Sequence, residues 1–156
     1  FLELKAALPR EMKDYSERFY AYRKRLKKEV ECWECLHRIY PQCVDFLAKH
    51  QDRFFVVTNK DRDSVITLAR YFGFLDRIIE IYSREISVNK PKLMKKLIED
   101  HGLDPSAHRM IYVDDHEDTL GEMKGLPLDL CLASWGYTGR PESSRFRMLK
   151  SLGELP

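Results

Sequence analysis

Polar side chains that could bind a phosphate group follow the apolar segments of this sequence. Thr58 and Asn59 come directly after an apolar run at 54–57. A hydroxyl and backbone N–H groups in such a position can bind phosphoryl oxygens. Lys90 precedes Pro91, the first residue of a predicted helix, where a cation is unfavourable unless an anion lies nearby. Each signal is weak alone, because Thr-Asn turns and surface lysines are common.

An acidic cluster follows another apolar run, at 110–113. Asp114, Asp115 and Asp118 fall within five residues, and carboxylates so close together repel each other unless a cation binds them. Mg²⁺ prefers one or two carboxylates, completed by water and phosphate oxygens. Asp118 is equally well explained as a helix N-terminal charge, but two adjacent acids after a strand are harder to explain by capping. The sequence therefore predicts a phosphoryl site with a divalent metal.

The segments that would position these residues alternate between strand and helix patterns from Pro41 onward. Short apolar runs predict strands at 54–57, 78–82, 110–113 and 128–133. Helices are predicted at 41–50, 62–72, 91–101, 117–124 and 143–152. This alternation predicts an α/β fold in which a parallel sheet has helices on both faces. Ligands of such sheets bind at the carboxyl ends of the strands, where the polar residues above fall.

The first forty residues have a different pattern. Apolar side chains recur at steps of three or four and predict one long amphipathic helix between Pro9 and Pro41; they are Met12, Tyr15, Phe19, Tyr22, Leu26, Val30, Trp33 and Leu36. A basic run at 23–28 could indicate nucleic-acid binding. Because the net charge is only +2, we interpret it as a solvated helix face and expect no nucleic acid partner.

Composition and cysteine content indicate a globular protein in a reducing compartment. Hydrophobic residues make up 44% of the 156 residues. No apolar run approaches the ~20 residues of a membrane span, and no signal-peptide pattern is present, so we expect a cytoplasmic protein with no membrane partner. Cys32, Cys35, Cys43 and Cys131 are expected to be free thiols. Cys32 and Cys35, with His37 and Cys43 nearby, could form a zinc site, but a second ligand pair separated by a loop is missing.

The order of these motifs resembles the haloacid dehalogenase-like (HAD) hydrolases, particularly the phosphoglycolate-phosphatase-like branch with a helical cap. The sequence Val-Val-Thr-Asn-Lys at 56–60 is similar to the second motif of the family, and Lys90-Pro91 is similar to the third. Residues 112–118 resemble the fourth motif, and Trp135-Gly136-Tyr137 resembles the segment after the last strand. The resemblance implies a HAD-like, Rossmann-like core at 41–156 and a helical cap segment at 1–40.

The resemblance also implies an activity. It suggests a magnesium-dependent phosphatase that hydrolyses a small phosphorylated metabolite through an aspartyl-phosphate. Thr58 and Asn59 would bind the phosphoryl oxygens, and Lys90 would neutralise charge. The acid that ligates Mg²⁺ is Asp115 by its position in the motif, or Asp114 by its spacing to Asp118.

The chain departs from the family pattern in two respects, of which the smaller is that Asp114 stands where the fourth motif usually begins with glycine. The first motif of the family is a strand ending in Asp-x-Asp that carries the nucleophile, and no such motif occurs before residue 41. Asp61 and Asp63 form Asp-x-Asp, but they follow the second motif and are predicted to start a helix. In the family the strand of the first motif is central, so its absence would expose two sheet edges. We expect an upstream segment to supply it; the alternative is a non-catalytic module that binds a phosphorylated ligand or a protein.

Overall fold

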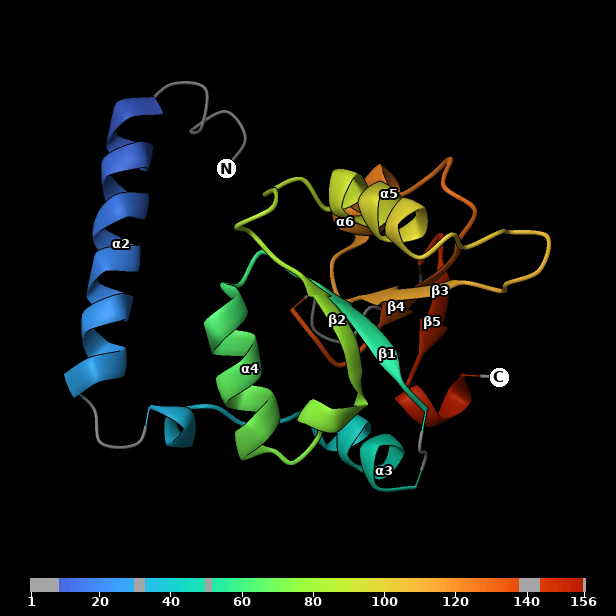
Figure 1. The fold of residues 1–156 in the computed structure, drawn as a ribbon, viewed down its shortest axis with the longest axis horizontal. Coiled ribbons are helices and arrows are strands. Elements are labelled where there is room, and N and C mark those ends of the chain that lie inside the picture. Colours follow the sequence, from blue (N-terminus) through green and yellow to red (C-terminus); the bar gives the residue numbers. More distant parts are fainter. Residues whose placement is uncertain (1–8, 30–32, 50–51, 138–143, 156) are drawn as a thin grey trace. The chain divides into compact units, whose positions relative to one another are not determined.

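The computed structural model of the chain describes residues 9–29, 33–49, 52–137 and 144–155. The chain divides into two compact units, Phe1–Arg38 and Ile39–Pro156, and each is described by itself. Their elements are labelled in Figure 1. Among the described residues, no helix is both long enough and apolar enough to cross a membrane.

The first unit contains helix α2 (Pro9–Glu29) and the short 3₁₀ helix η1 (Glu34–Leu36). The prediction of one helix continuing to Leu36 is therefore wrong. Trp33 is only 4% exposed, and the Arg23 guanidinium and the Lys27 ammonium lie 5.7 and 5.0 Å from its ring centroid. These cation–π contacts favour a chain that turns back on α2 over one that continues the helix. Val30 and Cys32, which the predictions included, lie outside the described residues.

The cysteines differ from the expectation at one position. Cys35 is disulfide-bonded, so the prediction of free thiols is wrong for this residue. Cys43 is a half-buried free thiol and Cys131 is a buried one. Burial raises the pKa of both thiols above the usual value, so both are kept in the protonated, less reactive form.

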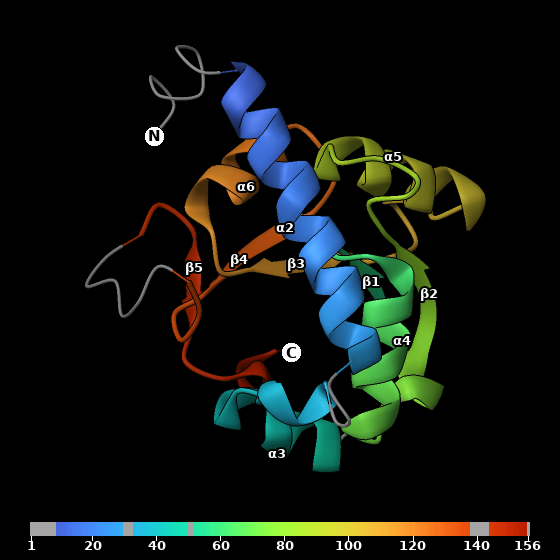
Figure 2. The ribbon, with the colours of Figure 1, turned by 90° about the vertical axis from the view of Figure 1, so that its left-hand side faces the viewer.

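The described residues of the second unit form five strands, paired in parallel in two sheets (Figure 1, Figure 2). In the first sheet β1 (Phe54–Val57) pairs with β2 (Ile78–Tyr82). In the second, β4 (Asp129–Ala133) lies between β3 (Ile111–Asp114) and β5 (Arg147–Leu149). The predicted α/β class and parallel pairing are confirmed, and the strands of the described residues are divided between two sheets. Within the described part of the chain, β1 and β3 each keep one edge without a strand partner.

The helices of this unit lie close to their predicted positions. They are α3 (Pro41–Lys49), α4 (Arg62–Tyr71), α5 (Lys90–Asp100) and α6 (Glu117–Glu122), with 3₁₀ turns η2 (Leu75–Arg77) and η3 (Leu152–Glu154). Side-chain caps fix two of the N-termini, because Asp61 accepts a hydrogen bond from the backbone N–H of Ser64 and Asn89 accepts one from that of Lys92. Asp61 is therefore the N-cap of α4.

The predicted helix at 143–152 is wrong, because its described part contains strand β5 and ends where turn η3 begins, at Leu152. Strand β5 pairs with β4 in the register Cys131 to Arg147 and Ala133 to Leu149. The backbone N–H of Ser134 also donates to the carbonyl of Leu149 at 3.1 Å. Pairing with an otherwise open strand edge satisfies the backbone of this segment, and a local sequence pattern does not reveal such a distant partner.

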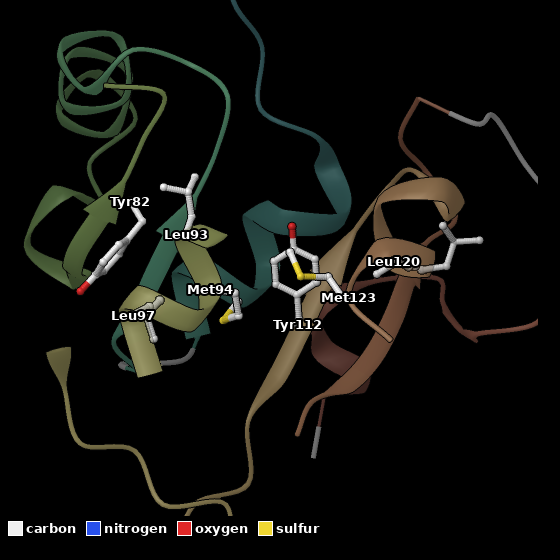
Figure 3. Close-up of a cluster of buried hydrophobic side chains, with 8 residues drawn as sticks. Tyr82, Leu93, Met94, Leu97, Tyr112, Leu120 and Met123 are labelled. Atoms are coloured by element: carbon white, nitrogen blue, oxygen red, sulfur yellow. The ribbon is translucent and has the colours of Figure 1, made fainter. Parts of the chain in front are cut away.

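One hydrophobic core joins the two sheets of the second unit. It contains side chains from β2, α5, β3, α6 and β4, namely Tyr82, Leu93, Met94, Leu97, Tyr112, Leu120, Met123 and Leu132 (Figure 3). All four residues of β1 are only partly buried, whereas Cys131, Leu132 and Ala133 of β4 are buried. A strand in the middle of a covered parallel sheet is normally buried on both faces. In its burial, β1 therefore resembles an edge strand.

Replacement of Leu149 by alanine tests the assignment of β5. The side chain is fully buried, so Leu149→Ala should lower the free energy of unfolding by about 2–5 kcal/mol in a urea titration. Lys150→Ala is the matched control, because Lys150 is exposed and its backbone N–H, which donates to Glu154, is retained. Equal and small effects of the two substitutions would contradict the placement of β5 in the core.

Candidate active site

A cavity of about 360 Å³ lies where β1 and β3 end and where the loop after β4 begins. Its lining residues come from the β1–α4 loop, the start of α5, the β3–α6 segment and the loop after β4: Asn59, Lys90, Asp114, Asp115, His116, Thr119 and Tyr137. The carboxyl ends of parallel strands are the usual ligand-binding edge of such a fold. The cavity thus brings together Asn59, Lys90 and both candidate metal ligands, as predicted from the strand ends.

Lys90 is the first residue of α5 and reaches the end of β3. Its ammonium nitrogen lies 2.5 Å from Asp114 Oδ2, and the two side chains are 19% and 7% exposed. An ammonium group in the first turn of a helix is disfavoured by the helix dipole. The Asp114 carboxylate offsets this effect, so the ion pair fixes Lys90 at the cavity.

Asp114 accepts hydrogen bonds from three donors. Besides Lys90, the Tyr112 hydroxyl donates to its Oδ2 at 2.8 Å, and the backbone N–H of His116 donates to its Oδ1 at 3.0 Å. Burial, together with the nearby Asp114 charge, raises the pKa of Tyr112, so the hydroxyl remains protonated and able to donate. Both carboxylate oxygens of Asp114 are therefore engaged by the protein itself.

Asp115 is positioned by the loop after β4. The backbone N–H of Tyr137 donates to Asp115 Oδ2 at 2.7 Å. A Cβ atom added at Gly136 would overlap the Asp115 side chain, so only glycine allows the loop to approach this closely. The loop thereby holds the second carboxylate beside the cavity.

Thr58 and Asn59 form a turn at the end of β1. The backbone N–H of Thr58 donates to the carbonyl of Tyr82 at 2.9 Å, which extends the pairing of β1 with β2. The Thr58 hydroxyl accepts a hydrogen bond from the N–H of Lys60 at 3.0 Å, so it organises the turn. Asn59 lines the cavity, whereas Thr58 and the exposed Asp118 do not belong to the lining set.

Three lining residues were not predicted as site residues: His116, Thr119 and Tyr137. The rings of His116 and Tyr137 are stacked, with centroids 5.4 Å apart and an angle of 28° between their planes. A signal for Tyr137 was present, because it follows the carboxyl end of a strand as the predicted residues do.

The donor set fits a magnesium ion better than zinc. The described residues contain no group of three or more His, Cys, Asp or Glu side chains that could hold a metal. Of the residues considered for zinc, Cys35, His37 and Cys43 are among those searched, and Cys32 lies outside the described residues. Mg²⁺ requires fewer protein ligands, because water and phosphate oxygens complete its octahedral shell. The Asp115 carboxylate, which lines the cavity beside Asp114, is of the type that meets this requirement.

A double-mutant cycle tests the ion pair between Lys90 and Asp114. With Lys90→Ala, Asp114→Asn and the combined variant, urea titrations should give a coupling free energy of about 1–3 kcal/mol, because the pair is mostly buried. Lys96 and Asp100 on the same helix are the matched control, since their ion pair at 2.8 Å is exposed and should couple more weakly. Coupling no larger than that of the control pair would contradict the geometry.

Comparisons with known proteins identify the family and agree with the fold. A model of haloacid dehalogenase-like hydrolases matches residues 4–124. Among solved structures, the fold is similar to a haloacid dehalogenase-like family hydrolase from Streptococcus pneumoniae, with a TM-score of 0.67 and 18% sequence identity. The match covers 88% of this chain and 67% of the other. A comparison with curated protein sequences finds no match. Because the family model spans most of the chain, this protein belongs to the haloacid dehalogenase-like hydrolases.

Proposed function

We propose that this hydrolase is a magnesium-dependent phosphatase that acts on the monoester of a small phosphorylated metabolite. The observation that carries the proposal is the placement of Lys90 against Asp114, beside Asp115, in one cavity at the strand ends. A fixed ammonium group and an adjacent carboxylate that can bind Mg²⁺ are the groups that stabilise a transferring phosphoryl group. Membership of the hydrolase family supports the same class of reaction.

Each residue of the cavity has a distinct role in this account. Lys90 binds a phosphoryl oxygen and neutralises the negative charge that develops on it. Asp114 holds Lys90 in place and, with both oxygens engaged, is a positioning residue. We assign the metal-ligating role to Asp115, which lies next to Asp114 in the lining of the cavity. Mg²⁺ bound there would reduce the repulsion between the phosphate and an attacking carboxylate. Asn59 contributes polar contacts at the opposite strand end.

The attacking carboxylate comes from another segment in this account, because both acids that line the cavity already have roles. Among the described residues, β1 and β3 each have an unpaired edge, and a parallel strand paired there would end at the cavity. An aspartate at its end would attack phosphorus, and the ester P–O bond would break as the leaving alcohol takes a proton from a neighbouring acid. Water would then hydrolyse the aspartyl-phosphate, releasing inorganic phosphate and restoring the carboxylate.

A second candidate function is non-catalytic binding of a phosphorylated ligand. Within the described part of the chain, the acids of the cavity are limited to Asp114 and Asp115, which favours this alternative. Such a module would use Lys90 and Asn59 for binding without turnover. The two functions differ in whether the full-length protein releases phosphate from a bound ester.

Substitution of Lys90 and Asp115 tests the catalytic account. In the full-length protein with Mg²⁺, Lys90→Ala and Asp115→Asn should each lower kcat for p-nitrophenyl phosphate by roughly 10²-fold or more, because each removes a charge that stabilises the transition state. Lys92→Ala, an exposed lysine of the same helix, is the control and should keep the activity. Substantial activity in both site variants would exclude these roles. An inactive wild type that still binds phosphate would favour the non-catalytic module.

Gly136→Ala tests the positioning of Asp115 separately. The added Cβ would overlap the Asp115 side chain, so the carboxylate must move and the Mg²⁺ concentration for half-maximal activity should rise at least tenfold. Gly153→Ala is the matched control, because the nearest atom to its added Cβ is Ser151 Oγ at 3.6 Å, an ordinary contact. An unchanged Mg²⁺ requirement in Gly136→Ala would argue against Asp115 as the ligand.

A further inference from the structure

We propose that His116 and Tyr137 bind the leaving group of the substrate, and that this group carries a flat aromatic ring. The inference rests on the proposed phosphatase function and specifies the chemical class of its substrate: an aryl or heteroaryl phosphate, or a phosphate ester with such a ring close to the ester oxygen.

The two rings are the aromatic members of the cavity lining. They are stacked with centroids 5.4 Å apart, and they come from the β3–α6 segment and from the loop after β4. The charged side chains Lys90, Asp114 and Asp115 line the same cavity and would surround the phosphate group. The aromatic pair thus provides a second, chemically different part of the lining, suited to the rest of the ester.

The position of the Tyr137 ring contributes little to the stability of the fold. It is 79% exposed, so its burial contributes little hydrophobic free energy. The residue is held by its backbone, because the N–H donates to Asp115 at 2.7 Å and neighbouring Gly136 allows the close approach of the loop. A backbone contact to a site residue therefore places an open aromatic face at the cavity.

An exposed face of this kind favours a planar ring over an aliphatic group of similar size. Aromatic rings stack with an energy beyond that of their buried area, corresponding to about threefold to tenfold in affinity. The cavity of about 360 Å³ has room for a group attached to the phosphate. We therefore expect the site to bind an ester with a planar aromatic leaving group more tightly than one with an aliphatic leaving group of similar size.

Phosphonates that cannot be hydrolysed test this inference without any dependence on turnover. Binding of phenylphosphonate and of cyclohexylphosphonate to the full-length protein, in the presence of Mg²⁺, is measured by titration calorimetry. The wild type should bind the phenyl compound about threefold to tenfold more tightly. Tyr137→Ala should bring this ratio close to one, whereas Tyr137→Phe, which keeps the ring, should retain it. Both variants keep the backbone N–H that holds Asp115.

The control variant and the outcomes separate this inference from the function on which it rests. Tyr71→Ala removes an exposed tyrosine of α4 that packs on Phe72 and should leave the ratio unchanged. Equal wild-type affinities for the two phosphonates, or a ratio that survives in Tyr137→Ala, would overturn the aromatic site and leave the phosphatase proposal standing. Failure of the wild type to bind either phosphonate would overturn both.

Discussion

The ion pair between Lys90 and Asp114 connects parts of the second unit that, among the residues described, no strand pairing connects. Helix α5 packs on β1 and β2, and its first residue reaches the last residue of β3, in the other sheet. Two charges that are largely removed from water are stable only when they are well paired and hydrogen-bonded. The hydroxyl of Tyr112 and the backbone of His116 complete this requirement. The position of the cavity depends on this cluster.

The rest of the site follows from the same cluster. Because Asp114 is held by Lys90 and Tyr112, the chain that leaves β3 presents the next residue, Asp115, to the loop after β4. That loop can contact Asp115 only through a glycine, Gly136, and the contact places Tyr137 beside His116. In our proposal, neighbouring residues of two loops bind the phosphate, the metal and the leaving group. A change in the position of one loop would therefore affect all three.

Local sequence patterns were sufficient for much of this fold. The strands at 54–57 and 78–82 occur at their predicted bounds, because short runs of β-branched and aromatic residues bounded by turn signals are distinctive. Predictions failed where a distant partner decided the conformation. Strand β5 forms because β4 offers an edge, and Trp33, the first described residue after α2, packs against Arg23 and Lys27 of that helix. The partner of β5 lies outside a window of neighbouring residues, and the spacing of apolar residues does not reveal the cation–π contacts of Trp33.

The candidate site was predictable to the extent that it follows strand ends. Lys90, Asn59 and the two aspartates were found from their residue types and from the edge of the sheet that they share. The stacking of His116 on Tyr137 could not be found in this way, since it depends on how closely two loops approach. Our proposal that Asp114 positions Lys90 while Asp115 binds the metal also used the hydrogen bonds, because the sequence alone leaves both acids as candidate metal ligands.

The most direct test of the account is to locate bound phosphate. Backbone amide signals of the isotopically labelled full-length protein are followed by NMR while inorganic phosphate and Mg²⁺ are added. The account predicts chemical-shift changes centred on Asn59, Asp115 and Tyr137, which line the cavity. Changes confined to the basic segment of α2, at residues such as Lys24 and Lys28, would contradict the account, as would the absence of any change at saturating phosphate.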